Sequence, residues 1–102
     1  MQVKPGARLK SQVCDTQVVI VRAPAIDVDV RCGGVAMVAA TETGAEGLAV
    51  DPAFAEATLL GKRYADDEVG IELLCSKGGA GTLSLGDTKL EVKGVKALPS
   101  SD

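Results

Sequence analysis

The chain has 102 residues, of which 46% are hydrophobic and 25% charged, with a formal net charge of -3. This balance predicts one globular domain with a modest core and argues against general disorder. The sequence holds no histidine, and its only aromatic residues are Phe54 and Tyr64. It therefore excludes histidine-based catalysis and metal sites within this chain. It also offers neither the basic patch nor the stacking platform of a nucleic-acid-binding protein.

The first ten residues, MQVKPGARLK, have no apolar stretch typical of a signal peptide. No apolar run approaches the length that spans a membrane. The cysteine count of three is odd, and it is low for a secreted disulfide scaffold. We therefore expect a cytoplasmic protein with no membrane partner, whose thiols are reduced or metal-bound.

The first predicted strand lies at residues 16–22, TQVVIVR, after a turn at Pro5-Gly6. Its apolar residues are β-branched and continuous, which predicts a strand buried on both faces. Pro24 ends this strand because proline has no N–H to donate to a neighbouring strand.

A second strand is predicted from the alternation in residues 26–32, IDVDVRC. Its apolar residues share one face, while charged residues occupy the other. The inward face is predicted to contain Ile26, Val28, Val30 and Cys32. Gly33-Gly34 then turns the chain, and a short strand at 35–38 is expected to follow.

The middle of the chain is predicted to contain a polar loop, one short helix and an acidic turn. The loop spans 41–47. Asp51 followed by Pro52 is a typical helix start, and Gly61 is a typical helix end, so the helix is expected over 51–61. The acidic turn spans 65–68.

The last third contains an alternating strand, a glycine-rich loop and a hairpin. Ile71, Leu73 and Cys75 are expected to face the core. The loop spans 76–81, and Gly86-Asp87 fits a two-residue hairpin turn of the II′ type between strands in 82–93. A frayed tail is expected from about residue 98. The sequence thus predicts a single mainly β domain over 1–102, a small antiparallel barrel or sandwich with one short helix.

The three cysteines are the first candidate site. Cys32 and Cys75 each end an alternating strand just before glycines, and Cys14 stands apart. Strong zinc or iron sites use closely spaced cysteine pairs, which this sequence lacks. Burial as small hydrophobic side chains is therefore the favoured interpretation. The alternatives are a thiolate metal site on Cys14, Cys32 and Cys75, with zinc favoured over iron, and a thiol enzyme with Cys32 as nucleophile.

Two further segments are weak candidates. The loop SKGGAG, residues 76–81, resembles a phosphate loop only in its glycines and lysine, and it leads into a strand rather than a helix. A mobile surface loop is the favoured interpretation. The carboxylates of Asp66, Asp67 and Glu68 lack the spacing of a calcium loop and are expected to form a solvated turn.

The segment after Asp51 gathers most of the bulky apolar side chains. The favoured interpretation is a helix that covers the open end of the barrel. The alternative is a docking surface for another protein, formed by Phe54, Leu60, Arg63 and Tyr64. The leading functional hypothesis is a non-catalytic β-domain that acts through protein contacts, as an accessory subunit or a self-associating module. Its expected partner is another protein subunit or a second copy. The alternative is the thiolate metal protein.

Overall fold

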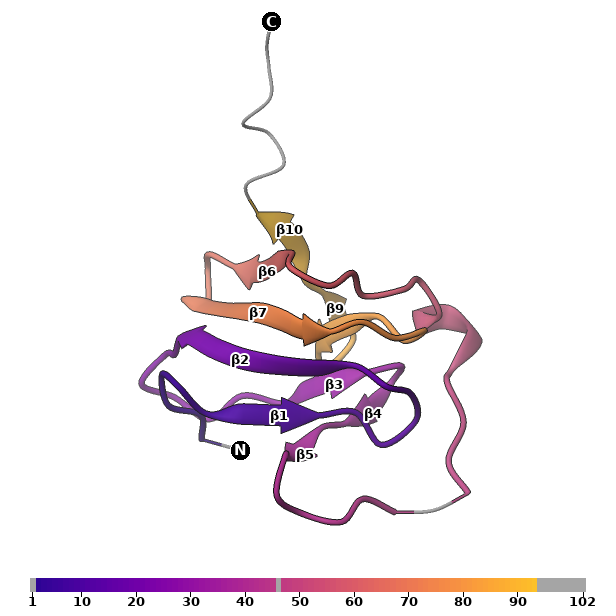
Figure 1. The fold of residues 1–102 in the computed structure, drawn as a ribbon. Helices are drawn as coiled ribbons and strands as arrows, with labels where there is room; N and C mark the ends of the chain where they lie inside the picture. Colours follow the sequence, from indigo (N-terminus) through magenta and orange to yellow (C-terminus); the bar gives the residue numbers. More distant parts are fainter. Residues whose placement is uncertain (1, 46, 94–102) are drawn as a thin grey trace, which may run out of the picture.

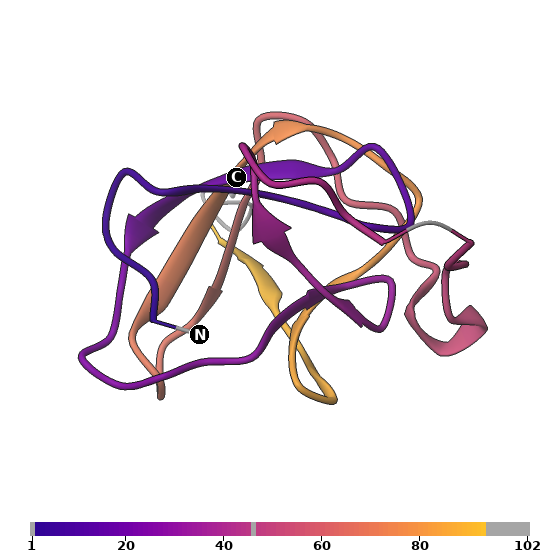
Figure 2. The ribbon, with the colours of Figure 1, turned by 90° about the horizontal axis from the view of Figure 1, so that it is seen from below.

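The computed structural model describes residues 2–45 and 47–93. It is mainly β, with two antiparallel sheets that do not close into a barrel and therefore form a sandwich-like fold (Figure 1, Figure 2). The predicted fold class is confirmed in its sandwich form. No helix in the described part of the chain is long and apolar enough to cross a membrane.

The larger sheet has six strands in the order β10-β6-β7-β2-β1-β5, and every neighbouring pair is antiparallel. Figure 1 shows these strands stacked from β5 at the bottom to β10 at the top. Their bounds in chain order are β1 Arg8–Lys10, β2 Gln17–Arg22, β5 Val38–Ala39, β6 Arg63–Asp66, β7 Ile71–Lys77 and β10 Glu91–Lys93.

The smaller sheet has four strands in the order β4-β3-β8-β9. Their bounds are β3 Val30–Cys32, β4 Val35–Ala36, β8 Leu83–Leu85 and β9 Thr88–Lys89. The chain leaves this sheet at Leu90 and enters the larger sheet at β10. The predicted single strand after Gly86-Asp87 is therefore two short strands in different sheets.

The core lies between the two sheets as one apolar cluster. Ile71, Leu73 and Cys75 are each at most 1% exposed, so the predicted inward face of β7 is confirmed. In β2 only alternate residues are buried, and Val21 is 40% exposed. The prediction that this strand is buried on both faces is therefore wrong, because the second sheet covers only one face.

The predicted alternation before Cys32 holds for its last three apolar residues. Val28, Val30 and Cys32 are buried, with Cys32 0% exposed. Ile26 is 60% exposed, so its predicted inward position is wrong. The regular strand begins only at Val30, and the chain bends at Ile26, which breaks the period of two.

The turns predicted at Gly33-Gly34 and at Gly86-Asp87 are both present in the structure. Gly33 and Gly34 both have positive φ, 67° and 83°, and they join β3 to β4 as a two-residue hairpin turn. Gly86 has φ 56° while no non-glycine residue in the described chain has positive φ. This combination agrees with the predicted II′ turn, because the I′ type requires positive φ at both central residues.

The predicted helix over 51–61 is reduced to one turn of 3-10 helix, η1, at Pro52–Phe54. Its start is as predicted, since the Asp51 side chain accepts a hydrogen bond from the Ala53 N–H. Beyond η1 the backbone bonds to residues far along the chain: Thr82 N–H donates to the Phe54 carbonyl, and Thr58 pairs with Gly79. These long-range bonds replace the helical ones. The predicted tail from about residue 98 lies outside the described residues.

Candidate functional site: a thiol pair and an open sheet edge

Cys14 lies in the turn that joins β1 to β2. The Ser11 hydroxyl organises this turn by accepting hydrogen bonds from the N–H groups of Val13 and Cys14, at 3.1 and 3.2 Å. The Ser11 N–H donates to the Thr16 carbonyl at 2.9 Å and closes the turn. Serine makes such local bonds readily, so this turn is a property of the local sequence.

The turn brings Cys14 against Cys32, and their Sγ atoms lie 3.7 Å apart. Cys14 belongs to a turn of the six-stranded sheet, whereas Cys32 ends β3 of the four-stranded sheet. The Sγ of Cys14 lies 3.4 Å from the Ser11 hydroxyl and 3.2 Å from the Thr16 hydroxyl, and it accepts a 3.4 Å bond from the Gly81 N–H. Two thiols thus meet across the sandwich, surrounded by hydrogen-bonding groups.

The two sulfurs have different acidities. Burial raises the pKa of Cys14, but hydrogen bonds with the Ser11 and Thr16 side chains and with the backbone outweigh this and lower the pKa to about 7. Burial raises the pKa of Cys32 to about 12, and the charge of Cys14 adds to the rise. Cys14 is only partly buried. The hypothesis that Cys32 is the accessible nucleophile is therefore wrong, because its side chain is fully enclosed.

The glycine-rich loop 76–81 packs on this thiol pair. A Cβ atom on Gly81 would lie 2.8 Å from Gly33 N and 3.0 Å from the Cys32 Sγ. A Cβ atom on Gly79 would lie 2.5 Å from the Thr16 hydroxyl. The Thr58 hydroxyl fixes the loop by donating to the Gly81 carbonyl at 2.6 Å. A mobile surface loop was predicted over 76–81; the structure places Ser76 and Lys77 in β7, and the glycines after them allow close contact between backbones.

Cys75 does not join the pair. Its Sγ donates to the Lys77 carbonyl at 3.2 Å, and burial raises its pKa. Within residues 2–45 and 47–93, no group of three or more cysteine and acidic side chains is placed to hold a metal ion. The metal site on all three cysteines stays a prediction, and the observed geometry favours a pair rather than a triad.

The second candidate surface surrounds β10, which forms one edge of the six-stranded sheet. Leu59 and Val92 are exposed by 54% and 42%. Both line a shallow hollow of about 190 Å3, which Leu90 also lines. We refer to β10, which contains Val92, together with Leu59 as the β10 edge.

The predicted docking residues differ in exposure and in contacts. Leu60 is exposed, and Phe54 is half-buried beneath the Nζ of Lys89, 5.8 Å from its ring centre. Arg63 is exposed and lies 3.5 Å from the Glu72 carboxylate. Tyr64 is 7% exposed, and its hydroxyl accepts a 2.9 Å bond from the Leu59 N–H, so it supports the loop that presents Leu59. The docking surface itself stays a prediction.

Two of the other edge strands, β5 and β4, are capped by the chain itself. At β5 the Ala39 N–H donates to the Glu42 carboxylate at 3.2 Å, and the Ala39 carbonyl accepts from the Glu42 N–H at 2.9 Å. At β4 the Ala36 carbonyl accepts from the Gln12 side chain at 2.7 Å. Across the described ranges, no similar bond caps the outer side of β10.

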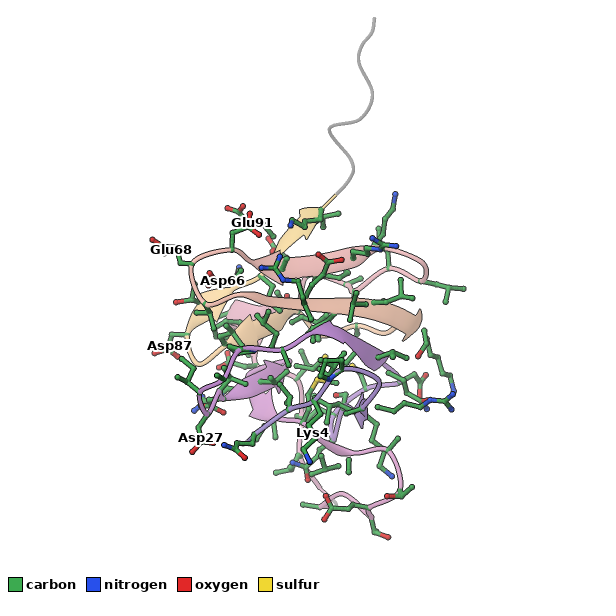
Figure 3. The ribbon with its side chains drawn as sticks, turned by 90° about the vertical axis from the view of Figure 1, so that its left-hand side faces the viewer. Lys4, Asp27, Asp66, Glu68, Asp87 and Glu91 are labelled. Atoms are coloured by element: carbon green, nitrogen blue, oxygen red, sulfur yellow. The ribbon has the colours of Figure 1, made fainter. Side chains whose placement is uncertain are left out.

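Several carboxylates lie on one side of the molecule. Figure 3 shows Glu91, Glu68, Asp66, Asp87 and Asp27 down its left-hand edge. The acidic turn predicted at 65–68 is displaced: Ala65 and Asp66 belong to β6 and Ala65 is buried, whereas the turn spans 67–70 with Asp67 and Glu68 exposed. Asp66 closes this turn by accepting bonds from the N–H groups of Glu68 and Val69.

The sequence reasoning missed Ser11, Thr16 and Gly81 as partners of Cys14. The sequence did hold a signal for this turn. A serine hydroxyl often accepts hydrogen bonds from the N–H groups two and three residues later, which here belong to Val13 and Cys14. No protein-family model matches the chain, and comparisons with curated proteins and with solved structures found no match.

Proposed function

We propose that the chain is a non-catalytic β-sandwich module that acts through protein contacts, and that it associates with a second copy of itself through the β10 edge. The observation that carries this proposal is the edge strand β10, whose outer side is capped by none of the described residues, with exposed Val92 in the strand and exposed Leu59 beside it. Open edges of this kind add strands from other chains. The proposed location is the cytoplasm, which keeps the three thiols reduced.

The sequence of β10 favours a second copy as the occupant. The strand reads Glu91, Val92, Lys93. If two copies pair antiparallel about Val92, each Glu91 lies opposite Lys93 of the other copy, and the two valines face each other. Opposite charges at directly paired positions stabilise a sheet by about 0.2–1 kcal/mol each. The edge is therefore complementary to itself in charge and in apolar surface.

Charge reversal tests this pairing. In Glu91→Lys the paired positions become lysine on lysine, and in Lys93→Glu they become glutamate on glutamate. We expect the wild-type chain to show a reversible dimer by sedimentation. Each variant alone should dimerise at least about tenfold more weakly, because two attractive pairs become repulsive. A mixture of the two variants should dimerise again, because every pair is then complementary.

The controls separate pairing from folding. Lys93 also contacts Asp67 at 3.0 Å and Glu72 at 3.6 Å, so thermal unfolding must show that Lys93→Glu is folded. Lys4→Glu changes the charge by the same amount on an exposed residue outside β10, and it should dimerise like the wild type. A strict monomer at every concentration would overturn self-association. Variants that dimerise as well as the wild type would overturn the β10 register.

A further inference from the structure

Cys14 and Cys32 form a thiol pair that the proposed contact surface does not use. Their sulfurs are in contact at 3.7 Å, and a disulfide requires about 2 Å. Cys14 is only partly buried, whereas Cys32 is fully buried. Of the two residues, only Cys14 therefore has surface in contact with solvent, where an oxidant arrives.

From this geometry we infer that Cys14 is a site of reversible oxidation by hydroperoxides, and that Cys32 resolves the oxidised Cys14 into an intramolecular disulfide. The site rests on the arrangement of the two sulfurs, the Ser11 and Thr16 hydroxyls and the Gly81 N–H. It is independent of the β10 edge.

The first step forms a sulfenic acid on Cys14. The Cys14 thiolate attacks one oxygen of hydrogen peroxide, the O–O bond breaks, and hydroxide leaves and takes a proton from solvent. Around Cys14 the structure supplies hydroxyl and N–H groups that favour the thiolate, which is the reactive form.

The second step forms the disulfide. The Cys32 sulfur attacks the Cys14 sulfur, the S–O bond breaks, and the hydroxyl leaves as water with the proton of the Cys32 thiol. Two thiols are oxidised and one peroxide is reduced to two waters. A dithiol reductant reverses the modification by exchange and becomes a disulfide itself.

The product links the two sheets covalently. Cys14 lies in the β1–β2 turn of the larger sheet, and Cys32 ends β3 in the smaller sheet. Because Cys75 bonds to the Lys77 carbonyl and does not contact the pair, it serves as an internal control thiol in the same core.

The experiment treats the full reduced chain with hydrogen peroxide, then alkylates the remaining thiols under denaturing conditions and maps them by mass spectrometry. We expect the wild type to lose Cys14 and Cys32 together and to keep Cys75. Cys75→Ala should oxidise at the wild-type rate. Cys32→Ala should stop at a sulfenic acid on Cys14 that dimedone traps, and Cys14→Ala should keep both of its thiols.

Several results would overturn the inference. They are three free thiols in the wild type after peroxide treatment, a disulfide that includes Cys75, or oxidation of Cys14→Ala at the wild-type rate. A bound zinc or iron ion found by elemental analysis of the purified chain, released on Cys14→Ser, would also overturn it in favour of metal binding. Circular dichroism verifies that each variant is folded, and Cys14→Ser replaces Cys14→Ala if the latter is not.

Discussion

Two segments, 27–34 and 70–79, look alike in sequence, since each alternates apolar residues up to a cysteine and then reaches a glycine pair. In the structure both sulfurs face the core, but their surroundings differ. Cys32 lies 3.7 Å from another sulfur, and its glycines form a two-residue turn. Cys75 bonds to its own strand end, and its glycines pack against distant backbone. The alternation along a strand therefore predicts that a cysteine side chain points into the core. The chemistry available to that cysteine depends on which groups it meets in the core.

The glycine pairs provide the strongest test of this difference. Gly79→Ala should destabilise the fold by about 3 kcal/mol, because its Cβ would lie 2.6 Å from the Thr16 backbone N. Gly44→Ala is the matched control, since its Cβ would come no closer than 3.2 Å to a neighbouring atom, which belongs to the Gln12 side chain and not to the backbone. We expect less than about 1 kcal/mol there. Denaturant unfolding measures both, and equal losses would contradict the close packing of the loop.

The second test compares the two cysteines under oxidising conditions. If Cys14 and Cys32 form a disulfide, the closed loop should stabilise the domain by about 2–3 kcal/mol, which raises Tm by roughly 10 °C. Cys32→Ala should lose this response to peroxide, whereas Cys75→Ala should keep it. Thermal melts with and without a dithiol reductant provide the measurement. A peroxide response in Cys32→Ala would assign the effect to another group.

The third test uses pH. Because the pKa of Cys14 is lowered to about 7, its thiolate fraction and its alkylation rate should rise as pH increases, with half of the maximum near pH 7. An ordinary cysteine reaches this point near pH 8.5. The buried Cys32 and Cys75 should stay unlabelled in the native protein. The same shift means that this group stabilises the fold above the ordinary pKa and loses that contribution as pH falls through about 7. A midpoint above pH 8 for Cys14 would contradict the assigned hydrogen bonds.

The smallest expected effect concerns one hydroxyl. Thr16→Val keeps the shape of the side chain but removes the oxygen that lies 3.2 Å from the Cys14 sulfur. The alkylation midpoint should move upward, and the rate at pH 7 should fall by about fivefold for a one-unit rise in pKa. Thr82→Val is the matched control, because that hydroxyl bonds to Glu56 instead. An unchanged midpoint in Thr16→Val would show that Ser11 and the backbone suffice.

The elements predicted well are those fixed by local chemistry. The inward face of β7, the Gly33-Gly34 turn and the Asp51 cap each depend on a few neighbouring residues. The helix after Asp51 failed because Phe54, Glu56 and Thr58 bond to residues 79–82, and no local pattern shows that competition. The predicted inward position of Ile26 was wrong for a similar reason. The chain bends at Ile26, so the alternation does not extend back to this residue.

The contact between Cys14 and Cys32 could not be predicted from the residues next to each cysteine. Cys14 and Cys32 are separated by a whole strand and a bend, and their contact depends on how the two sheets pack. The prediction named both residues among three candidates, but assigned reactivity to Cys32 from its neighbouring glycines. Glycine next in sequence does not expose a side chain that points into the core. The pKa of Cys14 is lowered first by the nearby Ser11 and Thr16, but one contributing hydrogen bond comes from Gly81, which lies 67 residues away in the chain.

The pairing of β2 with β7 has a consequence for how the domain folds. Val18 lies opposite Cys75, so the two central strands of the larger sheet are more than 50 residues apart in the chain. Such pairs form late in folding. Closing a long loop lowers the chain entropy before any contact between the two strands has formed to compensate for it. The hairpins β3–β4 and β8–β9 can form early, yet two-stranded hairpins are marginal alone. We therefore expect slow, concerted folding on the millisecond-to-second scale, with the thiol pair assembled only when both sheets are complete.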